Sequence, residues 1–300
     1  MLKHLQKNLR QLRNFLFQQA IAAEYKSAGL TVSAAPLSFG SMVYLENARQ
    51  SAREAIVMLH GFGADKSAWV RFAKLLDSRR RIVIPDLAGH GESTQDLSLD
   101  YGIEQQAIRL QEFLNALGIE KVHLIANSMG CAIALRFAAT NPQAISSLVL
   151  MDAAGVERTA GRLQTQIVET GRNPIVEIRT VEDYRSMLRF GMESPPWIPG
   201  IFVNLLAEEK IKRRNIEMKM LGDIEKDLDQ IAILGNIKAP TLIIWGAQDR
   251  VVHVDDAELL HERIAGSKKL ILAGIGHVPM VENPRLVATP CVSFLNELAA

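Results

Sequence analysis

The sequence predicts an α/β protein with a mainly parallel central sheet, helices on both faces and an inserted helical cap. Short apolar runs of strand length alternate with segments of helical periodicity over most of the chain, as in parallel α/β folds. This alternation stops between about residues 153 and 237, where helical patterns carry many charges, and then resumes. We therefore expect an N-terminal helix over 1–35, core segments over 36–152 and 238–300, and a cap over 153–237.

The composition is that of a globular protein. Hydrophobic residues make up 48% and charged residues 22% of the 300 positions, and the net charge is +1. These values exclude a disordered chain and the basic excess that is typical of nucleic-acid binding. No apolar run approaches the ~18 residues of a transmembrane helix. The two cysteines, Cys131 and Cys291, lie far apart and give no disulfide framework, and Cys131 is expected to be a packing residue.

The first twenty residues predict an amphipathic basic helix. They hold no acid, four bases (Lys3, Lys7, Arg10, Arg13) and leucines at positions 2, 5, 9, 12 and 16. One interpretation is reversible binding to an anionic membrane, at about 1 kcal/mol per base; the other is packing on the protein or on a second subunit. We expect no signal cleavage, because glutamines interrupt a short apolar stretch. The expected location is cytoplasmic or peripheral at the cytoplasmic membrane.

The core begins with a strand over 42–45 and a turn or hairpin over 46–53. The continuous apolar run Ala55–Leu59 predicts a strand buried on both faces, and it ends in the glycine-rich turn His60–Gly63. Such a turn brings backbone close to a ligand at the carboxyl end of a strand. The Phe62 N–H is therefore a candidate donor to a reaction oxyanion.

A helix is then expected over 69–76 and a strand over 81–84. The loop that follows the strand carries His90, for which a structural role is expected rather than a catalytic one, because it lies early in the chain inside a turn. Periodic apolar residues over 103–117 predict the next helix.

The turn centred on Ser128 is the main chemical signal. It follows the apolar run Val122–Ile125 and precedes a helical segment, so the serine sits where a buried strand turns sharply into a helix. Ala126 and Gly130 are small, as a strained nucleophile elbow requires. The Met129 N–H opens the helix and is a candidate oxyanion donor.

After a strand over 147–151, which ends at Asp152, the predicted cap begins. Its apolar residues are expected to form mainly the cap's own core, and some could line a pocket for an acyl chain. The remaining elements are a strand over 241–245, a helix over 255–265, a strand over 269–272 and a helix over 284–298. Asp249 and His277 follow these two strands, at the edge where α/β sheets bind ligands.

Serine, acid and histidine in this chain order, with a His-Gly turn earlier in the chain, are the signature of the α/β-hydrolase fold. The chain resembles this superfamily over about residues 40–298. More narrowly, it is similar to capped monoacylglycerol lipases and bacterial family V lipases through His60–Phe62, Asn127–Gly130 and Gly276–Glu282. Ala126 and Cys131 stand where these relatives usually have glycine.

The resemblance implies that His277 takes the Ser128 proton, that Asp249 orients the histidine, and that the Phe62 and Met129 N–H groups bind the oxyanion. No metal or organic cofactor is needed. Asp152 is a rival for the acid role, and the Gly-x-x-Asp loop together with the resemblance favours Asp249.

Three functions are compatible with this reading. The first is hydrolysis of carboxylic esters. Its substrates could be monoacylglycerols or lysophospholipids at a membrane, and a soluble short-chain esterase is equally compatible with the core motifs. The second is carbon–carbon cleavage of ring-fission products, whose enzymes typically have tryptophan after the histidine, where this chain has Val278. The third is a binding module without catalysis. Ester hydrolysis is preferred to carbon–carbon cleavage because that tryptophan is absent and the apolar cap suits an acyl group. It is preferred to a binding module because the complete set of catalytic groups is present. Chain length, alcohol and oligomeric state stay open.

Overall fold

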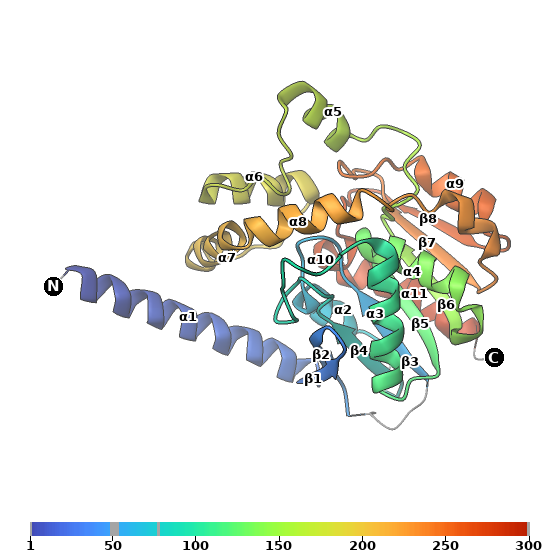
Figure 1. The fold of residues 1–300 in the computed structure, drawn as a ribbon, viewed down its shortest axis with the longest axis horizontal. Helices are drawn as coiled ribbons and strands as arrows, with labels where there is room; N and C mark the ends of the chain where they lie inside the picture. Colours follow the sequence, from blue (N-terminus) through green and yellow to red (C-terminus); the bar gives the residue numbers. More distant parts are fainter. Residues whose placement is uncertain (1, 49–53, 77–78, 299–300) are drawn as a thin grey trace.

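A computed structural model describes residues 2–48, 54–76 and 79–298 of the chain (Figure 1). Eight strands form one sheet in the order β1-β2-β4-β3-β5-β6-β7-β8. β1 and β2 pair antiparallel with each other, β2 pairs antiparallel with β4, and the other neighbours are parallel. The predicted α/β fold with a mainly parallel sheet is therefore confirmed.

The strands are numbered in chain order, which Figure 1 colours from blue at the N-terminus to red at the C-terminus. Their bounds are β1 Thr31–Leu37, β2 Gly40–Glu46, β3 Glu54–Leu59, β4 Arg81–Pro85, β5 Lys121–Asn127, β6 Ile145–Met151, β7 Thr241–Gly246 and β8 Lys268–Leu272. The helices are α1 Leu2–Ser27, α2 Val70–Ala73, α3 Ile103–Ala116, α4 Met129–Thr140, α5 Arg162–Thr170, α6 Val181–Gly191, α7 Gly200–Lys212, α8 Arg214–Ile224, α9 Asp256–Arg263, α10 Pro279–Glu282 and α11 Pro284–Glu297.

Helices cover both faces of the sheet because its central strands are apolar on both sides. In β3, Val57 and Leu59 pack in one core layer with α3, α4 and α9, while Ile56 and Met58 pack in a second layer with α2 and α11. Successive side chains of a strand point to opposite faces, so a continuous apolar run needs cover on each side.

Two elements differ from the expectation. β1 has no counterpart in the predicted elements, and it begins inside the segment 1–35 that was expected to be helical throughout. The helix expected over 69–76 is wrong in extent, because a 3₁₀ turn at Lys66–Trp69 precedes a helix of only four residues. Asp65 starts that turn by accepting a hydrogen bond from the Ser67 N–H. Most of the turn predicted over 46–53 lies outside the described residues.

Residues 153–237, which we call the cap segment, hold α5 to α8 and lie above the carboxyl ends of the strands (Figure 1). The end of this segment is bonded to the core at α3. The Asp227 carboxylate accepts from the N–H groups of Ile103 and Glu104 at 2.8 and 2.9 Å. Because α3 has no side-chain cap of its own, a residue of the cap segment satisfies the free N–H groups of its first turn.

The amphipathic helix α1 reaches out from the body of the molecule (Figure 1). Its middle part contacts the cap segment, where Arg13 donates to Glu208 at 2.7 Å and the Phe17 and Phe202 rings meet edge to face. Leu12, Phe15 and Leu16 remain largely exposed. No helix in the described part of the chain has the length and apolar character to cross a membrane.

Candidate active site

Ser128 occupies a strained turn between β5 and α4. Its φ of 54° lies in the left-handed region, which a residue with a side chain rarely adopts. The turn leaves no room for larger neighbours, since a Cβ added at Gly130 would lie 2.5 Å from the Leu59 carbonyl oxygen. A Cβ added at Gly61 would lie 3.0 Å from the Ser128 Cβ, so the His60–Gly63 turn packs directly against the serine.

Asp249 and His277 lie together at the ends of β7 and β8. The His277 Nδ1 is 2.8 Å from the Asp249 Oδ2, and the side chain of Asp249 is fully buried. The other Asp249 oxygen accepts from the N–H groups of Val251 and Val252 at 2.7 and 3.2 Å, which fixes the carboxylate. An ionised acid here gives Nδ1 the ring proton and leaves Nε2 as the free base.

The elbow and the histidine are joined through Asn127. Its side-chain Nδ2 donates to the His277 carbonyl oxygen at 2.9 Å and to the Met151 carbonyl oxygen at 3.1 Å. No direct hydrogen bond links the Ser128 hydroxyl to the His277 ring in the described chain. Hydrogen bonds between catalytic groups are often long before substrate binds, and they tighten in the complex with substrate.

Asp152, the rival acid, is buried beside Asp249 at the end of β6. Its Oδ1 accepts from the Gly246 N–H at 2.8 Å, and its φ of 49° is also left-handed. Burial and the neighbouring Asp249 hold the pKa of Asp152 well above its usual range. Burial beside a second carboxyl group favours the neutral form of Asp152. Asp152 thus lies beside Asp249, while Asp249 itself contacts the histidine.

By residue type and distance, a metal ion could be bound by Asp152, Asp249 and His277, since one ligand atom from each lies within 4.8 Å of the others. The direct 2.8 Å contact between His277 and Asp249 is, however, the geometry of a hydrogen-bonded acid–histidine pair.

Two backbone donors face the serine turn. Among the described residues, neither the Phe62 N–H nor the Met129 N–H has a hydrogen-bond partner. Free N–H groups at a tight turn and at a helix start are suited to bind a developing oxyanion.

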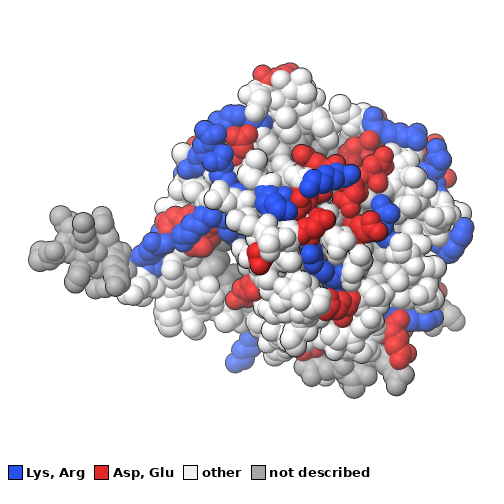
Figure 2. All heavy atoms as spheres, viewed as in Figure 1, with Lys and Arg blue, Asp and Glu red and all other residues white. Residues whose placement is uncertain are grey.

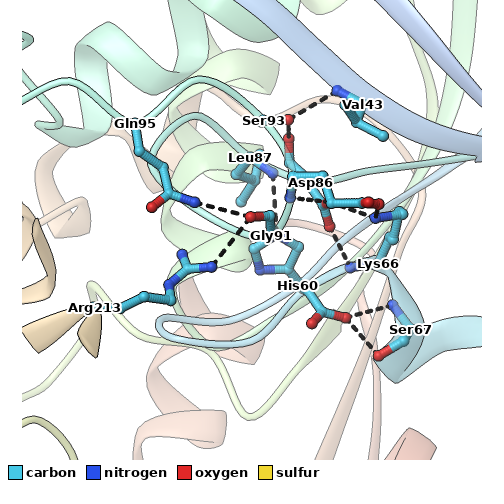
Figure 3. Close-up of polar contacts among 12 residues, drawn as sticks. Val43, His60, Lys66, Ser67, Asp86, Leu87, Gly91, Ser93, Gln95 and Arg213 are labelled. Atoms are coloured by element: carbon cyan, nitrogen blue, oxygen red, sulfur yellow. Dashed lines mark hydrogen bonds and ion pairs between the residues drawn. The ribbon is translucent and has the colours of Figure 1, made fainter. Parts of the chain in front are cut away.

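His60 holds the turn that carries Phe62. The Leu87 N–H donates to its Nε2 at 3.0 Å (Figure 3). Nε2 therefore carries no proton, and Nδ1 donates to the Gly61 carbonyl at 2.8 Å. His60 is fully buried, and burial lowers its pKa. The neutral ring therefore fixes the position of the turn.

His90, which the sequence suggests is structural, packs behind the same turn. It is fully buried with its ring 5.0 Å from that of His60 and 5.9 Å from that of Phe62. Burial, together with the neighbouring His60 ring and the positive charge of Arg213, keeps the pKa of His90 well below its usual range.

A buried ion pair supports this region from the other side. Figure 3 shows Lys66 pointing at Asp86, with 2.7 Å between Nζ and Oδ2, and Asp86 also accepts from the Glu92 N–H at 2.8 Å. Arg213, from the junction of α7 and α8, donates to the Gly91 and Gly89 carbonyls at 3.2 and 2.8 Å. The cap segment is thereby bonded to the loop beneath the Phe62 turn.

Lys210 of α7 brings a further charge to the Phe62 turn. It is buried, pairs with Glu217 at 2.9 Å, and lies 5.8 Å from the centre of the Phe62 ring. Gly63 has a φ of 68°, and a Cβ added there would lie very close to the Lys210 Nζ.

Cys131 and Cys291 are both free and buried.

The structure thus brings together Ser128, Asp249, His277 and the donors at Phe62 and Met129, all of which the sequence indicated. Sequence reasoning missed the bond from the Asn127 side chain to the histidine backbone, although Asn127 stood in the motif. It also missed Glu282, whose carboxylate accepts from the Gly276 N–H at 3.0 Å. The short distance between Asp152 and Asp249 could have been predicted, because the two residues follow the ends of β6 and β7, which are neighbours in the sheet.

Comparisons with known proteins agree with this geometry. A family model described as alpha/beta hydrolase fold matches residues 54–284. The chain is 34% identical to Lipase 1 of Psychrobacter immobilis over 88% of this chain and 84% of that one. It is 30% identical to the human monoacylglycerol lipase ABHD6 over 84% of this chain and 78% of that one.

Solved structures show the same likeness. The crystal structure of a membrane phospholipase A, described as a bacterial virulence factor, superimposes with a TM-score of 0.94 at 31% identity, covering 99% of this chain and 96% of that one. A 2-hydroxy-6-oxo-6-phenylhexa-2,4-dienoate hydrolase from Rhodococcus sp. strain RHA1 gives a TM-score of 0.74 at 23% identity, covering 89% and 99%. That second likeness shows the fold alone.

Proposed function

The chain belongs to the α/β-hydrolase fold family, and we propose that Ser128, Asp249 and His277 carry its ester hydrolysis through an acyl-enzyme on Ser128. The lipase and esterase class follows from lipase relatives at 30% to 34% identity over most of this chain. The observation that carries the assignment of residues is the strained Ser128 turn, whose neighbour Asn127 is bonded to the backbone of His277.

In the proposed mechanism, the unprotonated His277 Nε2 accepts the Ser128 proton as the hydroxyl oxygen attacks the ester carbonyl carbon. The imidazolium that forms is stabilised by the Asp249 carboxylate at Nδ1. It then donates its proton to the leaving alcohol as the C–O bond breaks. Water attacks the acyl-enzyme with the same histidine as base, which releases the acid and restores the serine.

The oxyanion of each tetrahedral intermediate would accept from the Phe62 and Met129 N–H groups. The absence of other partners for these donors among the described residues supports this role. Removing one such donor typically costs about 10²- to 10³-fold in kcat. The neutral His60 ring helps to hold the Phe62 donor in place.

We propose lipid esters, such as monoacylglycerols or lysophospholipids, as the substrate class. A groove of about 320 Å³ supports this proposal, since apolar side chains from α1, the cap segment and α10 line it. They include Phe17, Ile21, Ile198, Phe202 and Met280. Met280, one of these lining residues, belongs to α10, which directly follows the loop that carries His277.

The enzyme is further proposed to work at the surface of the cytoplasmic membrane through α1. Exposed apolar side chains on α1 (Leu12, Phe15, Leu16) and on the cap segment (Trp197, Ile201) support this. The face in Figure 2 mixes basic and acidic side chains over cap and core. We assign the attraction to an anionic surface to the bases of α1.

Carbon–carbon hydrolysis remains the second candidate, and a single assay separates the two. The assay is hydrolysis of a p-nitrophenyl ester series from acetyl to palmitoyl, with Ser128→Ala as the blank. Activity that peaks at medium or long chains and is lost in the variant is the expected result. Folded protein that is inactive at every length, and is not labelled by a fluorophosphonate, would overturn the ester hydrolase proposal.

A further inference from the structure

One turn of the cap segment crosses both loops that carry the acid and the histidine. We define the cap turn as residues 189–194, at the end of α6. Its Gly191 carbonyl accepts a hydrogen bond from the His277 N–H at 2.8 Å. The approach is close, since a Cβ added at Gly276 would lie 2.7 Å from the Glu193 nitrogen and 3.0 Å from the Gly191 oxygen.

Glu282 binds the cap turn and the histidine loop at once. Its Oε2 accepts from the N–H groups of Glu193 and Ser194 at 2.8 and 2.9 Å. The same carboxylate accepts from the Gly276 N–H at 3.0 Å and the Val278 N–H at 3.3 Å, which are the two neighbours of His277. Four backbone donors from two segments far apart in sequence therefore meet on one side chain.

Arg250 binds the same turn from the acid loop. It directly follows Asp249, and its guanidinium donates to the Arg189 and Met192 carbonyls at 3.2 and 3.5 Å. It also pairs with the Glu193 carboxylate. Glu282 thus holds N–H groups of the cap turn, while Arg250 holds its carbonyl groups.

We propose that Glu282 and Arg250 are positioning residues that fasten the cap turn across the acid and histidine loops and so set the geometry of the Asp249–His277 pair. The inference rests on the proposed function. Neither side chain touches the reacting atoms in this scheme. Both act through backbone groups on either side of the catalytic side chains. The position of His277 therefore depends on the position of the cap turn.

The chemistry of Glu282 makes the proposal testable by a change of a few atoms. A carboxylate can accept about four hydrogen bonds and donates none, whereas a glutamine amide keeps one acceptor oxygen and adds two donors. In Glu282→Gln the amide NH₂ would face backbone N–H groups, so the cap turn or the histidine loop must move. A displacement of about 1 Å near the chemistry can cost about 10²-fold in rate.

The first experiment compares Glu282→Gln with Glu297→Gln, a matched change in a surface pair with Lys268. Active sites are titrated with a fluorophosphonate, and kcat and KM are measured for p-nitrophenyl butyrate. We expect kcat per titrated site to fall by about 10²-fold in Glu282→Gln with KM changed by less than about threefold. Glu297→Gln should match the wild type in both constants.

A second variant, Arg250→Gln, tests the other arm and decides the matter if Glu282→Gln does not fold. It should also lower kcat per site, because the acid loop loses its bonds to the cap turn. Normal kcat per site in the folded variants, even with a lower Tm, would overturn the proposal and leave both residues with a merely structural role. An inactive wild type would instead overturn the proposed function.

Discussion

The side chain of Asn127 reaches from the serine turn to the histidine loop and donates to the His277 carbonyl oxygen at 2.9 Å. It is 3% exposed, and its second donor hydrogen binds the Met151 carbonyl oxygen at the end of β6. One amide group therefore joins the ends of β5 and β6 to the loop after β8. This bond fixes the relative position of two residues that are 150 positions apart in the sequence.

Asn127→Ala should lower kcat by about 10-fold, because the histidine loop loses its bond to the serine turn. The free energy of unfolding should fall by about 1–3 kcal/mol, since two buried carbonyl groups lose their donor. Steady-state kinetics and urea denaturation measure the two effects. Asn115→Ala on the exposed face of α3 is the control, and an equally active Asn127→Ala would show that the bond does not set the geometry of the site.

The two buried acids should respond differently to the same substitution. Asp249→Asn should lower kcat by about 10⁴-fold, because an amide cannot stabilise the imidazolium or hold its tautomer. Asp152→Asn should stay within about tenfold, since the raised pKa of Asp152 already favours a neutral side chain that can bond to Asp249. If Asp152→Asn were the more damaging change, the acid role would pass to Asp152.

Gly130→Ala should destabilise the fold by about 1–3 kcal/mol or more, because the new methyl group meets the Leu59 and His60 carbonyl oxygens at 2.5 and 2.8 Å. Backbone cannot yield there without moving β3. Gly222→Ala, inside α8 with nothing within 4 Å of its added Cβ, should be neutral or stabilise by up to about 1 kcal/mol. Thermal unfolding of the two variants tests this contrast.

Acid should weaken the fold through the buried histidines. The pKa values of His60 and His90 are lowered from 6.5, so below about this pH the unfolded chain binds more protons than the folded chain. Their contribution to stability is present above pH 6.5, falls as pH decreases below that value, and levels off below the folded pKa. Burial is the largest cause of the lowered pKa of His90, and Arg213 and Lys210 add positive charge near it, with the His60 ring also packed against it.

Denaturant unfolding at pH values from about 7.5 down to about 5.5 measures this slope. His90→Asn keeps a donor near the Ala88 carbonyl but no group that titrates in this range. Its free energy of unfolding should therefore fall less between the two pH values than that of the wild type. Equal slopes would mean that His90 does not contribute.

The membrane proposal predicts a loss of binding when the apolar face of α1 is made polar. Leu12, Phe15 and Leu16 are 54%, 60% and 47% exposed, and burying each in lipid would contribute about 1.5–3 kcal/mol. The triple change to serine should reduce sedimentation with phosphatidylglycerol vesicles, while hydrolysis of p-nitrophenyl acetate stays unchanged. Ile108→Ser with Val168→Ser, exposed positions on α3 and α5, is the control. Undiminished vesicle binding would contradict the proposal.

The sequence predicted the central strands because each is a continuous apolar run followed by a turn, and that pattern depends on burial on both faces. β1 was missed because it lies at the sheet edge with only Ala35 buried and with Pro36 inside it, so neither an apolar run nor strict alternation marks it. The candidate residues followed from the turns at strand ends. Their side-chain hydrogen bonds did not, since Glu282 and the cap turn meet only through the tertiary fold.

The strand order also bears on aggregation. β1 and β8 are the only strands of the described sheet with an unpaired side, and such a side can recruit a strand from another chain. Pro36 removes one backbone donor from β1. β8 opens with Lys268 and Lys269, whose ammonium groups pair with Glu297 and Glu258 beside the strand. The charges and the proline make both sides poor templates for intermolecular pairing, which helps to keep the folded chain from assembling into larger sheets.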